Sequence, residues 1–159
     1  MIKINLDGSF VPGEAFAGWD VVARSADGRI VGARAGRQEH VRDAFAAETV
    51  ALSHVVSFAA DLGLVRVTLE TDSQLLLEAI DLRKADYSAY AAVIEDTKYQ
   101  LKMWFSHHVI LVCWRSANSV AHELASMGRL CDPYHCMQWD SDVPAAVVVC
   151  VLADVDKHG

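Results

Sequence analysis

The chain has 159 residues, of which 53% are hydrophobic and 22% charged, and its formal net charge is −7. This length suits a single domain, and the apolar content is high enough for a buried core, which excludes an intrinsically disordered protein. The negative charge argues against a protein that coats nucleic acid through a general excess of Lys and Arg. No apolar run approaches the roughly 20 residues that span a membrane. The longest run, residues 143–153, is interrupted by Pro144.

The N-terminus and the cysteines predict an intracellular protein. Residues 1–6 alternate like a β-strand and lack the charged and then apolar pattern of a signal peptide. The four cysteines are irregularly spaced, which is typical of reduced thiols rather than of a disulfide framework. We therefore expect a nuclear or cytoplasmic location, with neither secretion nor a membrane partner.

The N-terminal third has the pattern of β-strands. Three strands are predicted, at residues 2–6, 17–23 and 29–35. Asp7-Gly8 is predicted as the turn that ends the first strand, and residues 26–28 as the hairpin turn between the second and the third. These strands should form an antiparallel meander.

The remainder alternates between helices and strands. Helices are predicted at residues 43–62, 73–82, 88–105 and 118–127, and strands at residues 65–71 and 109–114. Asp43, Ser73 and Asn118 are the expected helix caps. This order predicts an α/β fold with a five-stranded mixed sheet, three antiparallel strands followed by two parallel ones, and flanking helices. We expect one domain over residues 1–128 and a tail, residues 129–159, that packs on the domain or extends it.

Three carboxylates are candidates for a functional site in this arrangement. The first and fourth strands should be parallel neighbours, and ligands bind at the carboxyl ends of such strands, where Asp7 and Asp72 lie. Both have ordinary structural explanations, as a turn residue and a helix cap. Glu48 falls on the apolar stripe of the first helix, where a carboxylate needs a compensating charge. A shared Mg²⁺ or Mn²⁺ would compensate all three, and two such metals suit phosphodiester cleavage.

Four motifs in this order resemble the ribonuclease H family. They are Asp7-Gly8-Ser9, Ala46-Ala47-Glu48, Glu70-Thr71-Asp72-Ser73 and residues 115–125. The likeness is to the plant ribonuclease-H-like, reverse-transcriptase-associated domains and covers residues 2–128. It implies a ribonuclease-H-like fold and endonucleolytic cleavage of the RNA strand of RNA/DNA hybrids, or of structured RNA, with two Mg²⁺ or Mn²⁺ ions.

The resemblance also implies roles for individual residues. Asp7 would bind both metals, and Glu48 and Asp72 one each, with Glu48 near the 2′-hydroxyl that distinguishes RNA from DNA. His122 stands at the fourth catalytic position, which is acidic in the active family. Imidazole is a poorer ligand for Mg²⁺ than carboxylate and tolerates Mn²⁺ better, so we expect cleavage that is slow, Mn²⁺-preferring or absent. The residues expected to bind nucleic acid are Ser9, Ser73, Arg115 and Asn118.

A basic segment offers two interpretations. Between residues 24 and 42, five arginines accompany only two acidic residues. Such a segment is ordinary solvated surface or a strip that faces phosphates.

The alternative function is a binding module with the same fold and little or no catalysis. It would engage a protein or nucleic-acid partner, for example as a bait domain in a plant immune receptor. The net negative charge and His122 favour this alternative, whereas the intact acidic trio disfavours it. The apolar residues 147–152 are predicted as an added strand or an apolar strap, and self-pairing of such a strand would give a homodimer.

Overall fold

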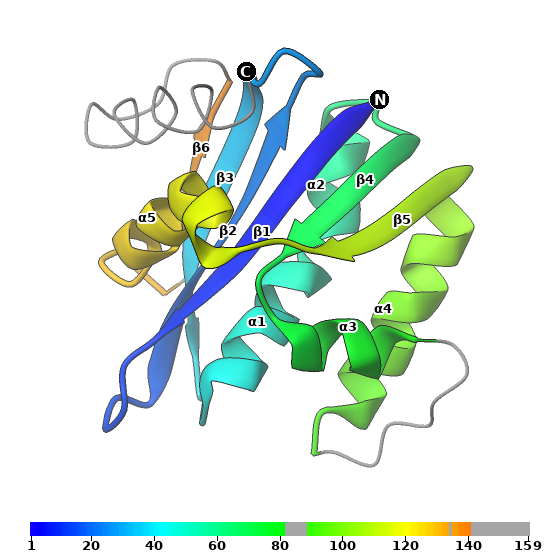
Figure 1. Ribbon diagram of the computed structural model, residues 1–159. Coiled ribbons are helices and arrows are strands. Elements are labelled where there is room, and N and C mark those ends of the chain that lie inside the picture. The colour runs from blue at the N-terminus through cyan, green and yellow to red at the C-terminus, as the bar shows by residue number, and fades with distance from the viewer. Residues whose placement is uncertain (82–88, 134, 141–159) are drawn as a thin grey trace.

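The computed structural model describes residues 1–81, 89–133 and 135–140 (Figure 1). The strands are β1 (Ile2–Phe10), β2 (Phe16–Arg24), β3 (Ile30–Glu39), β4 (Arg66–Thr71), β5 (His107–Val112) and β6 (Cys136–Trp139). The helices are α1 (Ala44–Ser53), α2 (Val55–Asp61), α3 (Gln74–Ile80), α4 (Ala91–Trp104) and α5 (Ser119–Gly128), with a 3₁₀ turn at Arg115–Asn118. None of the helices in these described ranges has the length and hydropathy of a transmembrane segment.

The strands form one mixed sheet in the order β5-β4-β1-β2-β3-β6. The strands β1, β2 and β3 pair antiparallel, and β4 and β5 extend the sheet in parallel from β1, as predicted. The prediction of five strands is wrong, because β6 adds a sixth, antiparallel to β3. This strand is too short for its alternation to be noticed, but Met137 and Trp139 pack against the core. Residues 147–152 lie outside the described part of the chain.

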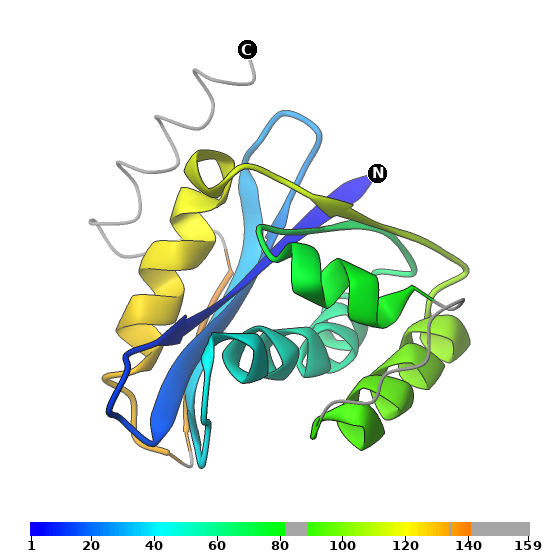
Figure 2. The ribbon, with the colours of Figure 1, turned by 60° about the horizontal axis from the view of Figure 1, so that its bottom comes forward.

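Helices cover both faces of the sheet (Figure 2). Helix α5 lies on one face, where its Val120 and Leu124 pack with Val22 of β2. The helices α1 to α4 lie on the other face, over a larger core that includes Leu6 and Val21. Because side chains alternate along a strand, the odd-numbered residues at the centre of β1 face α5, while Leu6 faces α1.

Strand β1 continues past the predicted turn at Asp7-Gly8. Asp7 pairs with Asp20, and Gly8 with Trp19, inside the β1–β2 ladder. Glycine is needed at position 8 because a Cβ there would lie 2.4 Å from a backbone carbon of Ala47. The prediction of a turn was therefore wrong, since Gly8 instead allows α1 to lie directly against β1.

The predicted helix over residues 43–62 divides at His54. Asp43 caps α1 as predicted, accepting a hydrogen bond of 2.7 Å from the amide of Ala46. His54 then has φ −88° and ψ −10°, and its ring stacks on Trp19 with centroids 3.6 Å apart. The packing of this ring on the sheet accompanies the break between α1 and α2.

Candidate active site

Three predicted acids come together where β1 and β4 part. The parallel ladder between these strands ends at the pair Asn5–Glu70. Asp7 lies just beyond this point on β1, Asp72 follows β4, and Glu48 projects from α1. Each of these three carboxylates offers an oxygen, and these oxygens lie within 4.8 Å of one another. The structure thus places this acidic trio, Asp7, Glu48 and Asp72, at the carboxyl ends of neighbouring parallel strands.

Burial makes the acidic trio electrostatically unfavourable in the absence of a cation. Asp7 is 2% and Glu48 8% exposed, and Oε2 of Glu48 is buried without a hydrogen-bond partner. Burial and the charge of Asp7 raise the pKa of Glu48 well above its usual value. The same two causes raise the pKa of Asp72, against the weaker opposing effects of Arg115 and His122.

The donor set of the trio fits a hard divalent cation. Carboxylate oxygens are the preferred ligands of Mg²⁺ and Mn²⁺, and the partnerless oxygen of Glu48 is an available ligand atom. Among the residues that the structure describes, this is the one group of three or more acidic, histidine or cysteine side chains close enough to share an ion. Asp7, Glu48 and Asp72 would together hold such a cation and offset their mutual repulsion.

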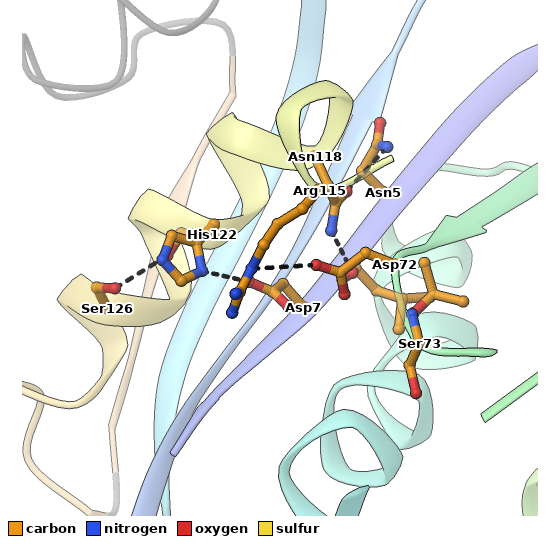
Figure 3. A network of polar contacts seen from close by, with 10 residues as sticks. Asn5, Asp7, Asp72, Ser73, Arg115, Asn118, His122 and Ser126 are labelled. Atoms are coloured by element: carbon orange, nitrogen blue, oxygen red, sulfur yellow. Dashed lines mark hydrogen bonds and ion pairs between the residues drawn. The ribbon is translucent and has the colours of Figure 1, made fainter. Parts of the chain in front are cut away.

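Two basic groups lie at the rim of the acidic trio (Figure 3). His122 on α5 places Nδ1 3.0 Å from Oδ2 of Asp7, and this hydrogen bond is the main reason why the pKa of His122 is raised. Arg115, in the 3₁₀ turn, places Nε 3.8 Å from Oδ2 of Asp72. Its side chain is 79% exposed, so the guanidinium can also reach a phosphate in solvent.

Asn118, expected to bind nucleic acid, is fully buried. Its Nδ2 donates to the carbonyl of Leu6 at 3.1 Å, and its Oδ1 accepts from Nδ2 of Asn5 at 3.1 Å. Asn5 also donates to Glu70 of β4 at 3.1 Å. Asn118 makes no capping hydrogen bond and instead ties the start of α5 to β1, which helps to set the position of His122.

The two serines expected to bind nucleic acid differ in position. Ser73 caps α3, its Oγ accepting a hydrogen bond of 3.1 Å from the amide of Leu76, as predicted for a capping residue. Ser9 lies on β1 two residues beyond Asp7, opposite Gly18 of β2, and is partly exposed. Of the two, Ser9 keeps a hydroxyl on the same face of the strand as Asp7.

The basic segment of residues 24–42 does not form a strip of free cations. Two of its arginines, Arg24 and Arg34, are buried in the sheet. Arg29 pairs with Asp27 at 2.8 Å, and Arg37 pairs with Glu39 at 2.6 Å. Most of the local positive charge is therefore used within the protein.

Sequence reasoning missed one acid of the region, Asp20. It is fully buried on β2, directly opposite Asp7. A signal was present in the sequence, because Asp20 interrupts the apolar run from Ala17 to Ala23. An acidic residue inside an otherwise apolar strand needs a reason for its burial.

The mixed sheet, with α5 on one face and α1 to α4 on the other, is the ribonuclease H-like fold. Ribonuclease H1 from Halobacterium salinarum is similar, with a TM-score of 0.69 and 22% identity over 80% of this chain and 96% of that one. The N-terminal ribonuclease H domain of Rv2228c from Mycobacterium tuberculosis has a TM-score of 0.69 and 21% identity, covering 80% and 92% of the two chains. LC11-RNase H1, isolated from compost, has a TM-score of 0.73 and 18% identity, covering 80% and 94%.

Comparison of the sequence with known protein families identifies the family of the chain. Residues 5–128 match the family described as reverse transcriptase-like. Because this match covers most of the chain, the chain belongs to the reverse transcriptase-like family. No curated protein matches it.

Proposed function

We propose that the chain is a metal-dependent, ribonuclease-H-like endonuclease that cleaves the RNA strand of RNA/DNA hybrids or structured RNA. The observation that carries this proposal is the acidic trio, whose oxygens converge within 4.8 Å and include a buried oxygen without a partner. The family and fold support it, as does the solved complex of LC11-RNase H1 with an RNA/DNA hybrid, a structure with a TM-score of 0.65 to this chain.

The proposed chemistry assigns a task to each side chain. Bound Mg²⁺ or Mn²⁺ would supply a water of lowered pKa and charge for the leaving oxygen. Asp7, whose charge acts on both Glu48 and Asp72, would hold both ions, and Glu48 and Asp72 would hold one each. Arg115 would contact a phosphate beside Asp72, and Ser9 would contact the backbone of the substrate along β1. The 2′-hydroxyl next to Glu48 would provide selectivity for RNA.

A binding module with the same fold is the second candidate. The observation in its favour is His122, which puts an imidazole rather than a carboxylate against Asp7. The pairing of Arg29 and Arg37 with acids also leaves little free positive charge for gripping a hybrid. Such a module would retain the trio as a cation site without turnover.

Cleavage of an end-labelled RNA/DNA hybrid distinguishes these candidates. The wild type, Asp7→Asn and the control Asp96→Asn would be compared, with Mg²⁺ and Mn²⁺ titrated separately. Asp96 is exposed on α4, where it pairs with Gln100, so its substitution removes a carboxylate outside the trio. We expect Asp7→Asn to lower the rate roughly a hundredfold or more, which is about 2.7 kcal/mol of transition-state stabilisation, while Asp96→Asn cleaves like the wild type.

The outcomes separate clearly once circular dichroism shows that each variant is folded. Equal cleavage by Asp7→Asn and the wild type would contradict the proposal, because the activity would then come from another site or a contaminant. Absence of cleavage by the folded wild type in either metal would favour the binding module, whose partner is a protein or a nucleic acid.

A further inference from the structure

Asp20 is a fourth carboxylate beside the acidic trio. It lies on β2 directly opposite Asp7 of β1. Since alternate side chains share a face, Asp20 is on the same face as Val22, which packs beneath α5. Asp20 is therefore enclosed between the sheet and α5, and it is 0% exposed.

The carboxylate of Asp20 has no hydrogen-bond partner of its own. Both of its oxygens are closed to solvent, and no donor reaches either of them with the geometry of a full hydrogen bond, although the backbone amide of Asp7 lies near enough to act weakly on the carboxylate. After burial, the charges of Asp7 and Glu48 are the main causes that raise the pKa of Asp20, and the backbone of Asp7 and the Arg24 guanidinium oppose the shift more weakly. The side chain thus lies within the electrostatic reach of the trio. Burial of an acid without a hydrogen bond destabilises a fold, so its presence needs an explanation.

We propose that Asp20 is an outer carboxylate of the cation site, which strengthens binding of a divalent cation from behind Asp7 without contacting the ion. Asp20 does not belong to the group whose oxygens converge within 4.8 Å, so its effect passes through Asp7 and its own charge. It is accordingly a positioning residue. This inference rests on the proposed function, because it requires a cation at the trio.

Formal charges show why the site benefits from Asp20. The trio supplies three negative charges, whereas two divalent cations carry four positive ones. His122 supplies no negative charge at the position where the resemblance places a fourth acid. The positive charge of bound cations would oppose the effect of burial and of the neighbouring carboxylates on Asp20, and an ionised Asp20 would then restore this charge from a neighbouring strand, at a site that water does not reach.

The test is the Mn²⁺ affinity of the whole chain, measured by isothermal titration calorimetry and by thermal unfolding in Mn²⁺ or in EDTA. Asp20→Asn keeps the shape of the side chain and removes its charge. We expect it to bind Mn²⁺ about tenfold to a hundredfold more weakly, as is usual for residues that support metal ligands, and to show a smaller Mn²⁺-induced rise in Tm. Asp20→Ser, a second neutral variant, should lose the same affinity, and Asp96→Asn none.

The variants also separate this inference from the proposed function. If Asp7→Asn abolishes Mn²⁺ binding while Asp20→Asn and Asp20→Ser bind like the wild type, the role of Asp20 is overturned and the proposed site stands. A lower Tm in EDTA with unchanged affinity would likewise overturn it, because it would show a purely structural role. Absence of Mn²⁺ binding by the wild type would overturn both.

Discussion

His122 is the residue that most affects which metal this site would use. Its Nδ1 approaches Asp7 at 3.0 Å, so the imidazole occupies a position from which a carboxylate could share a cation. The side chain of His122 is 47% exposed, so the shorter side chain of an aspartate would fit at this position and would remain in contact with solvent. The metal preference of the protein should therefore depend on this one position.

His122→Asp should increase Mg²⁺-supported cleavage, because a carboxylate is a better ligand for Mg²⁺ than an imidazole. We expect roughly a tenfold gain in rate, which is about 1.4 kcal/mol of transition-state stabilisation, and a weaker preference for Mn²⁺. His122→Asn serves as the control, since it removes the imidazole without adding charge. The measurement is the initial rate of hybrid cleavage in each metal, and equal rates for the Asp and Asn variants would contradict the expectation.

Residue patterns predicted the acidic trio more readily than its surroundings. Asp7 and Asp72 were predicted because they lie at the ends of neighbouring strands. Glu48 was predicted because it is a carboxylate on the apolar stripe of a helix. The sequence did not reveal the burial of Asn118, because a polar residue before a helix is ordinarily a cap and its partner Asn5 is 113 positions away. Asp20 was not predicted because its position, too, depends on a contact between residues distant in the sequence. It lies opposite Asp7 only through the register of β1 and β2.

At the scale of elements, the close contact of α1 with β1 sets the geometry of the site. Gly8 gives the backbone of Ala47 the space to approach, and Glu48 follows directly in the helix. The sequence signal was ambiguous, because Asp-Gly also favours a turn. Only the ladder to β2, with Gly8 opposite Trp19, shows that β1 continues.

His54, the residue at the break between α1 and α2, should make the stability of the fold depend on pH in the acid range. Burial, and secondarily the charge of Arg34, lowers the pKa of His54 from 6.5 to about 4. The folded state therefore binds fewer protons than the unfolded state between these values, and this contribution to stability is complete above pH 6.5 and is lost as the pH falls toward 4. From pH 7 to pH 5 we expect the free energy of unfolding to decrease by about 2 kcal/mol through His54.

Urea unfolding at pH 7 and pH 5 checks this expectation against His54→Phe, which keeps an aromatic ring against Trp19 and cannot titrate. All other ionisable groups are the same in the two proteins, so the difference between them isolates His54. The same loss of stability in the variant as in the wild type would show that His54 is not responsible.

At the scale of the whole molecule, the order of elements predicted the α/β architecture, since strand and helix periods alternate clearly from β1 to α5. The sixth strand was not predictable in the same way. Only four residues, Cys136–Trp139, form β6, and its place beside β3 follows from tertiary packing of Met137 and Trp139. Periodicity in the sequence was thus enough to predict the fold. The sixth strand depends on tertiary packing, and the shared face of Asp7 and Asp20 depends on the register of β1 and β2, and neither can be read from periodicity.

The central claim is that the acidic trio is a divalent cation site, and diffraction from crystals soaked in MnCl₂ tests it most directly. Anomalous scattering would locate manganese independently of any activity. We predict anomalous density within bonding distance of the Asp7 carboxylate and of Glu48 or Asp72, and its loss in Asp7→Asn crystals. Well-ordered acidic side chains without manganese between them, at concentrations that saturate the solution titration, would contradict the claim.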